Sequence, residues 1–383
     1  MDSSYEQELT VVFEAIQVAT AISRTVLQFL HPSSDAGPAP AAPADPELAA
    51  LRTSLQVLKD DNTFVTAADL AIQAVLLRVL SVAFPTHRLV AEESAAQLRA
   101  DPALLAIVTS LAVTHSRASA FVWAHGGGDV AAHVMRLFDR AAAPQPATSA
   151  LDPTWVIDPI DGTAAFMRGE HYAINVAHLC DSRQILSVVA LPLLSPTTTT
   201  PITDADTAPA SGGTLVFAVR GYGAHVAPLG SPSESRALPR HADAVPLAGL
   251  ASVTCYGTLK SGYDGMHAAV AAKLAMPFPG TNLLGWVPRW AALALGLGNT
   301  TVWVYRRRDR YAKVWDHAGA MLLFEEVGGM VTDVDGRDID LSPGRLLNAN
   351  FGFVAAPRSV HHHVLAAVKT LLQEQGRAGF PAK

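Results

Sequence analysis

An apolar segment that ends in two acids constrains this chain more than any other feature. Residues 155–163 read WVIDPIDGT, so a predicted buried strand runs directly into Asp158 and Asp161, with no basic residue between them. Burying a carboxylate away from water without a partner costs free energy, and neighbouring carboxylates repel each other. We therefore expect a cation at the end of this strand.

Other acids follow the same pattern, each at the point where apolar sequence stops. They are Asp69 in TAAD, Glu92 and Glu93 in AEES, and Asp316 in VWDHAGA. Each acid alone is more commonly a helix cap or a solvated turn residue. Mg²⁺ prefers oxygen ligands, and this set contains no His or Cys at metal-binding spacing. Taken together, the acids indicate a site for hard divalent cations.

The turn that begins at Pro159 offers further groups to such a site. Its geometry allows both carboxylates to point to one side, with the carbonyl oxygen of Ile160 between them, and Gly162 lets the chain bend. Thr163 is expected to begin a short helix whose free N–H groups suit a phosphate oxygen. Two cations about 4 Å apart, an activated water and a helix N-terminus together form a site for phosphoryl hydrolysis.

The hydrophobic pattern predicts helices and strands mixed along the chain. Helices are expected at 5–30, 66–82, 263–275, 286–298, 316–328 and 360–375, and strands at 88–94, 154–158, 172–179, 185–192, 214–226 (a hairpin), 300–306 and 352–357. Glu325 and Glu326 are expected on an exposed helix face, and the three histidines at 361–363 on the surface.

Residues 193–213, rich in Thr and Pro, mark either a domain boundary or a long hairpin loop. We predict an N-terminal α+β domain over 1–192 with most metal ligands. A C-terminal domain over 213–383 would carry the substrate-recognition segments and Asp316.

Composition excludes several classes of function. The chain has 383 residues, is 50% hydrophobic and has a net charge of −6, which argues against nucleic-acid polymers or membrane surfaces as partners. The first residues include Glu6, Glu8 and Glu14 and lack the basic region of a secretory signal. The only two cysteines, Cys180 and Cys255, fit a reducing compartment. We expect a cytoplasmic protein with a small-molecule ligand.

Several motifs resemble those of a known family. WVIDPIDGT, VAEES and VWDHAGA resemble the motifs of the inositol monophosphatase-like superfamily of lithium-sensitive, Mg²⁺-dependent phosphatases. KDDNTFVTAAD, DPIDGTAAFMRGEHYAI, FAVRGYGAH and KVWDHAGAMLLFEEVGGMVTDVDG resemble its 3′(2′),5′-bisphosphate nucleotidase branch more closely. The resemblance covers roughly residues 10–375, with insertions at 31–47, about 97–150 and 193–212.

The resemblance implies an α+β fold, the layered αβαβα sandwich of the inositol monophosphatase/fructose-1,6-bisphosphatase type, as a monomer or homodimer. It also implies two or three Mg²⁺ per active site and inhibition by lithium. By this resemblance, Glu92, Asp158 and the Ile160 carbonyl would bind the first metal, and Asp158, Asp161 and Asp316 the second. Asp69 with Thr163 would orient and deprotonate the attacking water, and Glu93 would support the ligands. The amides of Gly162 and Thr163 would bind the scissile phosphate.

The substrate-recognition segments depart from the bisphosphate nucleotidase pattern. TCYGTLKSGY offers Tyr256 or Lys260 where that branch has a His/Ser-bearing loop. In LLGWVPRWAALALG, Gly285 and Trp286 replace a polar pair, and Arg289 replaces a Lys. Arg289 could bind a second phosphate, and spare positive charge lies at 306–308, including Arg306. Trp286 and Trp290 would either stack on a base or fill the core.

Three functions follow from this reading. The first is a Mg²⁺-dependent phosphomonoesterase acting on adenosine 3′,5′-bisphosphate. The second keeps the chemistry but takes an inositol phosphate, a sugar phosphate or a specialised-metabolite phosphate. The third is a non-catalytic binding protein on the same scaffold, which would be expected to lack at least one of the metal-binding acids.

Overall fold

The computed structural model describes residues 5–31, 57–58, 64–65, 67–116, 119–120, 123, 129–143, 152–242, 244–256, 261–263, 265–342 and 344–375. The insertion at 31–47 lies outside these residues except for its first residue. Lys260 and residues 124–128 and 144–150, within the insertion at about 97–150, also lie outside them. At 57–58 and 64–65 only the backbone is described, as the two short strands β1 (Val57–Leu58) and β2 (Phe64–Val65).

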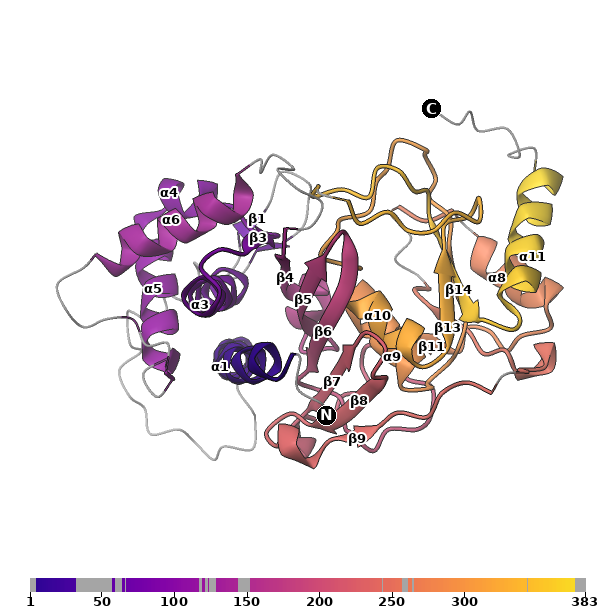
Figure 1. Ribbon diagram of the computed structural model, residues 1–383, viewed down its shortest axis with the longest axis horizontal. Helices are drawn as coiled ribbons and strands as arrows, with labels where there is room; N and C mark the ends of the chain where they lie inside the picture. Colours follow the sequence, from indigo (N-terminus) through magenta and orange to yellow (C-terminus); the bar gives the residue numbers. More distant parts are fainter. Residues whose placement is uncertain are drawn as a thin grey trace.

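A seven-stranded sheet forms the middle of the molecule (Figure 1). Its strands follow the order β3-β4-β5-β6-β7-β8-β9, with β3 parallel to β4 and every other pair antiparallel. Their bounds are Arg88–Ala91, Thr154–Asp161, Ala173–Cys180, Arg183–Leu191, Thr214–Val219, Ala224–Pro228 and Arg236–Ala237. The central strands β4 to β7 are almost continuously apolar because both faces of the sheet are covered.

Helices from the N-terminal part of the chain cover one face. They are α1 (Glu6–Leu30), α3 (Ala67–Ala83), α4 (Ala96–Ala100), α5 (Pro102–Ser116) and α6 (Val130–Ala142). Helices α1 and α3 pack on the strands, and α5 and α6 pack on α3 from outside (Figure 1). By length and composition α1 could cross a membrane, but 56% of its most apolar window is buried inside the protein, as in a core helix.

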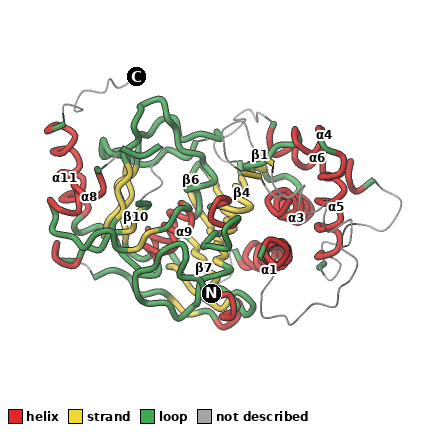
Figure 2. Tube along the Cα trace, turned by 180° about the vertical axis from the view of Figure 1, so that it is seen from behind, coloured by secondary structure: helices red, strands yellow, loops and turns green. Residues whose placement is uncertain are grey.

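The other face of the sheet carries three further layers. Helices α9 (Trp286–Ala294) and α10 (Ala320–Glu326) separate it from a second sheet of order β12-β14-β13, formed by Thr301–Trp303, Phe353–Pro357 and Gly329–Thr332. Helices α8 (Met266–Lys273) and α11 (His361–Glu374) form the outermost layer (Figure 2). The short parallel pair β10 (Val253–Thr254) and β11 (Thr281–Asn282) lies beside β12. The sandwich is therefore αβαβα, as the family resemblance implied.

The segment 193–213 connects two strands of one sheet. Strands β6 and β7 pair antiparallel from Leu186↔Val219 to Leu191↔Thr214, which is the hairpin-loop alternative. The segment also contains a short 3₁₀ turn, Pro209–Ser211. Two hydrophobic cores lie on the two faces of the central sheet. The division into domains at 1–192 and 213–383 stays a prediction, although the central sheet takes strands from both parts.

The prediction of an exposed face at the end of α10 is wrong for Glu326. This residue is 8% exposed, and its carboxylate accepts hydrogen bonds from the backbone N–H groups of Gly221 and Gly223 at 3.0 and 2.9 Å. Glu325 forms an ion pair with Arg220 at 3.0 Å. The two acids therefore tie α10 to the turn between β7 and β8, a contact that helical periodicity cannot reveal.

The run of histidines at the start of α11 divides between core and surface. His361 is buried, and its Nε2 lies 3.1 Å from the carbonyl oxygen of Val354. His362 and His363 are exposed, as the sequence predicted. The predicted surface position is therefore wrong for His361, which faces the core because successive residues of a helix point in different directions.

Candidate active site

Three of the predicted acids converge at one end of the central sheet. Asp158 and Asp161 come from β4, and Asp316 comes from the turn before α10; carboxylate oxygens of all three lie within 4.8 Å of one another. Residues three apart on a regular strand point to opposite faces, but the pairing of β4 with β5 shifts register between Asp158 and Asp161. This irregularity, which contains Pro159, lets both carboxylates reach the same space.

The pKa shifts of these carboxyl groups show which other acids lie near them. Burial, followed by the charges of Glu92, Asp161, Asp316 and Asp69, raises the pKa of Asp158 well above its usual range. Burial and the charges of Asp161 and Glu92 likewise raise the pKa of Asp316. Glu92 therefore lies close enough to repel all three converging acids, and Asp69, from another segment, close enough to repel Asp158.

The group fits a divalent cation. Oδ1 of Asp158 is buried and accepts no hydrogen bond from any residue that the structure describes. A buried carboxylate oxygen in this state, beside other carboxylates, needs a positive charge. All candidate ligand atoms are oxygens, the type that Mg²⁺ prefers.

A buried amide connects the segments of Asp69 and Glu93. Asp69 lies in the first turn of α3, and Gln73 follows one helical turn later on the same face. The side chain of Gln73 accepts from the Glu93 amide at 2.8 Å and donates to the Glu93 carbonyl at 2.9 Å. The backbone just after β3 is thereby fixed relative to Asp69.

A second buried amide holds the turn that carries Asp316. Asn175 lies opposite Asp158 in the β4–β5 pair, and its Nδ2 donates to the carbonyls of Trp315 at 2.9 Å and Ala318 at 3.0 Å. The helix predicted over 316–328 begins only at Ala320, because residues 315–318 form this bound turn. Sequence reasoning missed Asn175; the signal was an amide inside an apolar strand.

The first turn of α9 contacts the carboxylate of Asp161. Oδ2 of Asp161 accepts a hydrogen bond from the Val287 amide at 2.6 Å. Burial raises the pKa of Asp161 to about 7, although this amide opposes the shift. A Cβ on Gly285 would lie 2.6 Å from the same oxygen, so only glycine permits the contact. Glycine at 285 therefore has a structural cause.

Residues 160–163 form the tight turn that the sequence predicted. Gly162 has φ +90° and begins the single-turn helix α7 (Thr163–Phe166). Oγ1 of Thr163 donates to the Ile160 carbonyl at 3.1 Å. The amides of Gly162 and Thr163 donate to no other residue that the structure describes. Their contact with a phosphate, and the roles assigned to Ile160 and Thr163, stay predictions.

Arg289 is placed differently from a typical phosphate ligand. It is 2% exposed, and its guanidinium lies over the rings of Trp286 at 3.6 Å and Trp303 at 4.9 Å. Its Nε donates to the Gly285 carbonyl at 3.0 Å. The predicted core role fits Trp290, which is fully buried, whereas Trp286 is partly exposed. Binding of a substrate phosphate by Arg289 stays a prediction.

Tyr256 and Arg306 are accessible. Tyr256 is 62% exposed and meets the ring of Phe278 edge-on at 5.7 Å. Arg306 is exposed, and its Nε donates to the Gly262 carbonyl at 2.7 Å. Both residues can contact a ligand, and their assignment to substrate binding stays a prediction.

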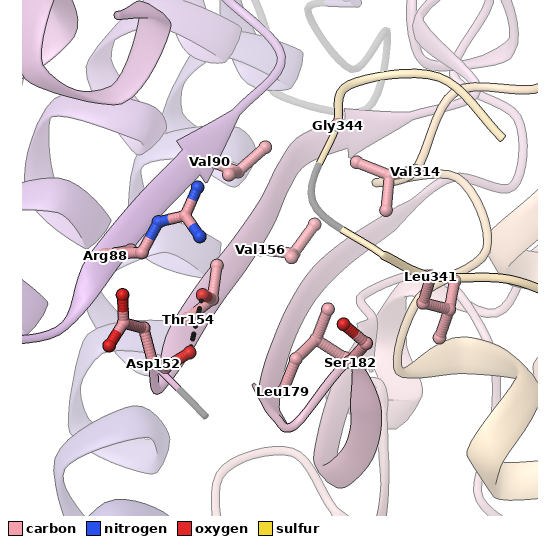
Figure 3. Close-up of a pocket in the computed structure, with 10 residues that line it drawn as sticks. All are labelled: Arg88, Val90, Asp152, Thr154, Val156, Leu179, Ser182, Val314, Leu341 and Gly344. Atoms are coloured by element: carbon pink, nitrogen blue, oxygen red, sulfur yellow. Dashed lines mark hydrogen bonds between the residues drawn. The ribbon is translucent and has the colours of Figure 1, made fainter. Parts of the chain in front are cut away.

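A small pocket elsewhere does not coincide with the acids. It has a volume of about 30 Å³ and lies between Val90 and Val156 on one side and Val314 and Leu341 on the other (Figure 3). None of the predicted site residues lines it. The carboxylate group, rather than this pocket, is the candidate active site.

Comparisons with known proteins match the chain to one family. A model of the inositol monophosphatase family matches residues 45–373. A 3′(2′),5′-bisphosphate nucleotidase of Emericella nidulans is 32% identical over 336 residues, which are 83% of this chain and 91% of that protein. A probable 3′(2′),5′-bisphosphate nucleotidase 4 of Arabidopsis thaliana is 28% identical over 97% of this chain and 96% of its own length. The solved structure of extragenic suppressor protein suhB from Bartonella henselae superposes with a TM-score of 0.55 at 16% identity, covering 94% of this chain and 98% of that one.

Proposed function

Because the chain belongs to the inositol monophosphatase family, we propose that it is a Mg²⁺-dependent phosphatase that hydrolyses a phosphate monoester of a small metabolite. The observation that carries the proposal is the convergence of Asp158, Asp161 and Asp316 at the end of the central sheet. A non-catalytic binding protein is the weaker reading, because every acid that the chemistry needs is present.

The metal-binding roles divide among residues of three segments. Glu92, Asp158 and the carbonyl of Ile160 would hold one Mg²⁺, and Asp158, Asp161 and Asp316 a second. When bound, the ions neutralise the carboxylates, lower the pKa of water and balance the charge that develops on the phosphate.

The remaining roles belong to the protein's own groups. Asp69, at the start of α3, takes the proton of the attacking water, and the hydroxyl of Thr163 orients that water. The amides of Gly162 and Thr163 bind the phosphate oxygens. Glu93 would support the ligands from behind, with its backbone held by the side chain of Gln73.

We propose adenosine 3′,5′-bisphosphate as the substrate, on the basis of the relatives named as bisphosphate nucleotidases. Tyr256 is the exposed residue that we assign to the nucleoside, and Arg289 is assigned to its second phosphate, with the exposed Arg306 as additional positive charge. The alternative substrates are an inositol, sugar or specialised-metabolite phosphate. One observation favours them: Gly285 and Trp286 leave no polar pair at the start of α9.

A phosphate-release assay tests the function. Purified protein with Mg²⁺ should release phosphate from adenosine 3′,5′-bisphosphate faster than from inositol 1-phosphate or fructose 1,6-bisphosphate, and lithium should inhibit. Asp158→Asn should abolish turnover, whereas Asp139→Asn, at an exposed acid on α6, should leave it unchanged. If the native protein and Asp158→Asn were both inactive toward the whole panel, the proposal that this protein is a phosphatase would be refuted.

A further inference from the structure

Arg345 connects the two parts of the chain that supply the candidate metal ligands. Its Nη1 donates to the Ala91 carbonyl and its Nη2 to the Glu92 carbonyl, both at 2.7 Å. Ala91 is the last residue of the edge strand β3, and Glu92 follows it directly. One planar guanidinium therefore grips two consecutive peptide groups with its two outer nitrogens.

The backbone of Arg345 is fixed to the segment before Asp316. The Val314 amide donates to the Arg345 carbonyl at 3.0 Å, and the Leu347 amide donates to the Ala312 carbonyl at 2.9 Å. The guanidinium of Arg345 also lies over the Trp315 ring, 4.6 Å from its centroid. Residues 345–347 thus run antiparallel to residues 312–314, in the segment that leads into Asp316.

The surrounding surface explains why this connection is needed. Between the strands and the segment around Gly344 the packing is incomplete, since the small pocket separates Val90 and Val156 from Val314 and Leu341 (Figure 3). At this space the side chains of the two segments make fewer direct contacts, so packing holds the end of β3 and the Asp316 segment together less firmly. Arg345, whose neighbour Gly344 lines the pocket, adds two direct hydrogen bonds between these segments.

We propose that Arg345 is a positioning residue for the metal site: it sets the separation between Glu92 and Asp316, which come from distant parts of the chain. The proposal rests on the proposed function, because it assigns these two acids to the cations. Arg345 does not touch the substrate. It acts through the Glu92 backbone, so the loss of its two hydrogen bonds lets the Glu92 carboxylate shift away from the other ligands.

The positive charge of Arg345 affects Mg²⁺ binding in the opposite direction to its hydrogen bonds, so the two effects must be measured separately. Its positive charge lies near Glu92 and Glu93. Removal of that charge would favour a nearby cation, whereas loss of the paired hydrogen bonds would disfavour it. Arg345→Lys keeps the charge but cannot grip both carbonyls, so it isolates the positioning effect. Arg345→Met removes both.

The test measures Mg²⁺ binding by calorimetry, with phosphate release as a second readout. We expect Arg345→Lys to raise the Kd for Mg²⁺ at least about tenfold, the lower end of what the loss of a partner behind a metal ligand causes. The KM for the phosphate substrate should change less than about twofold, and kcat should recover at saturating Mg²⁺. In metal-free protein, urea unfolding identifies any general loss of stability.

Arg140 on α6 gives a matched control. Its Nη2 donates to the carbonyls of Pro85 and His87, both at 2.9 Å, so it binds the chain just before β3, at the end away from Glu92. Arg140→Met should leave the Kd for Mg²⁺ unchanged.

One result would overturn the proposal while the function stands: Arg345→Lys binds Mg²⁺ as well as the native protein does. If Arg345→Met then bound Mg²⁺ more tightly, Arg345 would act by charge alone. If the native protein itself bound no Mg²⁺, the proposed function would fail first and this proposal with it.

Discussion

Asp161 combines a buried carboxylate with a pKa of about 7, so it links the stability of the metal-free protein to pH. The unfolded chain loses this proton near pH 4, whereas the folded protein keeps it until about pH 7. Between these values the folded state binds more protons. Its free energy of unfolding should therefore fall as pH rises, by up to about 1.4 kcal/mol per pH unit for this group.

We expect Asp161→Asn to flatten this dependence. Urea unfolding with a chelator at pH 5, 6 and 7 measures it, and the exposed Asp139→Asn serves as the control. The same pH slope in Asp161→Asn and native protein would contradict the assignment.

Asn175 gives a prediction about the Asp316 turn. Asn175→Leu keeps the branched arrangement of heavy atoms in the side chain but leaves the carbonyls of Trp315 and Ala318 without their donor. We expect the free energy of unfolding to fall by about 1–3 kcal/mol and Mg²⁺ affinity to fall with it. Urea unfolding and calorimetry measure the two effects.

Asn299 separates stability from positioning, because its side chain also makes two backbone hydrogen bonds, to Ala251 and Gly249, each at 2.9 Å. Asn299→Leu should lower stability but retain Mg²⁺ affinity. Equal losses of affinity in both variants would show that Asn175 acts only through general stability.

The acids could be predicted residue by residue, while the groups that orient them could not. Asp158, Asp161 and Asp316 each end an apolar segment, and this local signal is readable without a structure. Arg345 and Asn175 bind backbone carbonyls of distant segments. Every residue has such a carbonyl, so no sequence pattern identifies which one will be the partner.

At the scale of elements, the contact between β4 and α9 makes Gly285 essential. Its φ of −68° suits any residue, so the restriction is purely one of space. In Gly285→Ala the new methyl would lie 2.6 Å from Oδ2 of Asp161 and 2.8 Å from Cδ of Pro288. Either the carboxylate or the first turn of α9 must move.

We expect Gly285→Ala to cost about 1–3 kcal/mol of stability and to weaken Mg²⁺ binding, as measured by urea unfolding and calorimetry. Gly230→Ala is the control, since a Cβ there would meet no atom within 4 Å. Native Mg²⁺ affinity in Gly285→Ala would show that the Asp161 position is not critical.

Elements with a long, regular pattern were predicted within a residue or two. Helix α1 and strands β5 and β6 are examples, because their buried positions dominate their sequences. Helix α5 was missed inside the predicted insertion at 97–150, since its apolar residues are too evenly spread to show a helical face. Strand β13, four residues long, gave too short a signal.

For the whole molecule, the central sheet determines how the chain should unfold. It takes strands from before and after the segment 193–213, so neither part keeps its core when the other unfolds. The candidate metal site likewise takes Asp158 and Asp161 from before this segment and Asp316 from after it. Metal binding should therefore stabilise the protein as one cooperative unit.

A cation that binds only the folded state raises stability by about 2.7 kcal/mol at a concentration of 100 times its Kd. In a chain of this length that corresponds to a rise in Tm of roughly 3 °C. We expect one thermal transition in chelator and one, shifted upward by this amount, in saturating Mg²⁺.

Asp316→Asn should lose most of this shift, because it removes the one ligand that comes from the C-terminal part of the chain. Asp338→Asn, at an exposed acid of the same part, should keep it. Differential scanning calorimetry of the three proteins makes the comparison. If Asp316→Asn showed the native shift, the cations would be held by the N-terminal acids alone, and the site would not span the two cores.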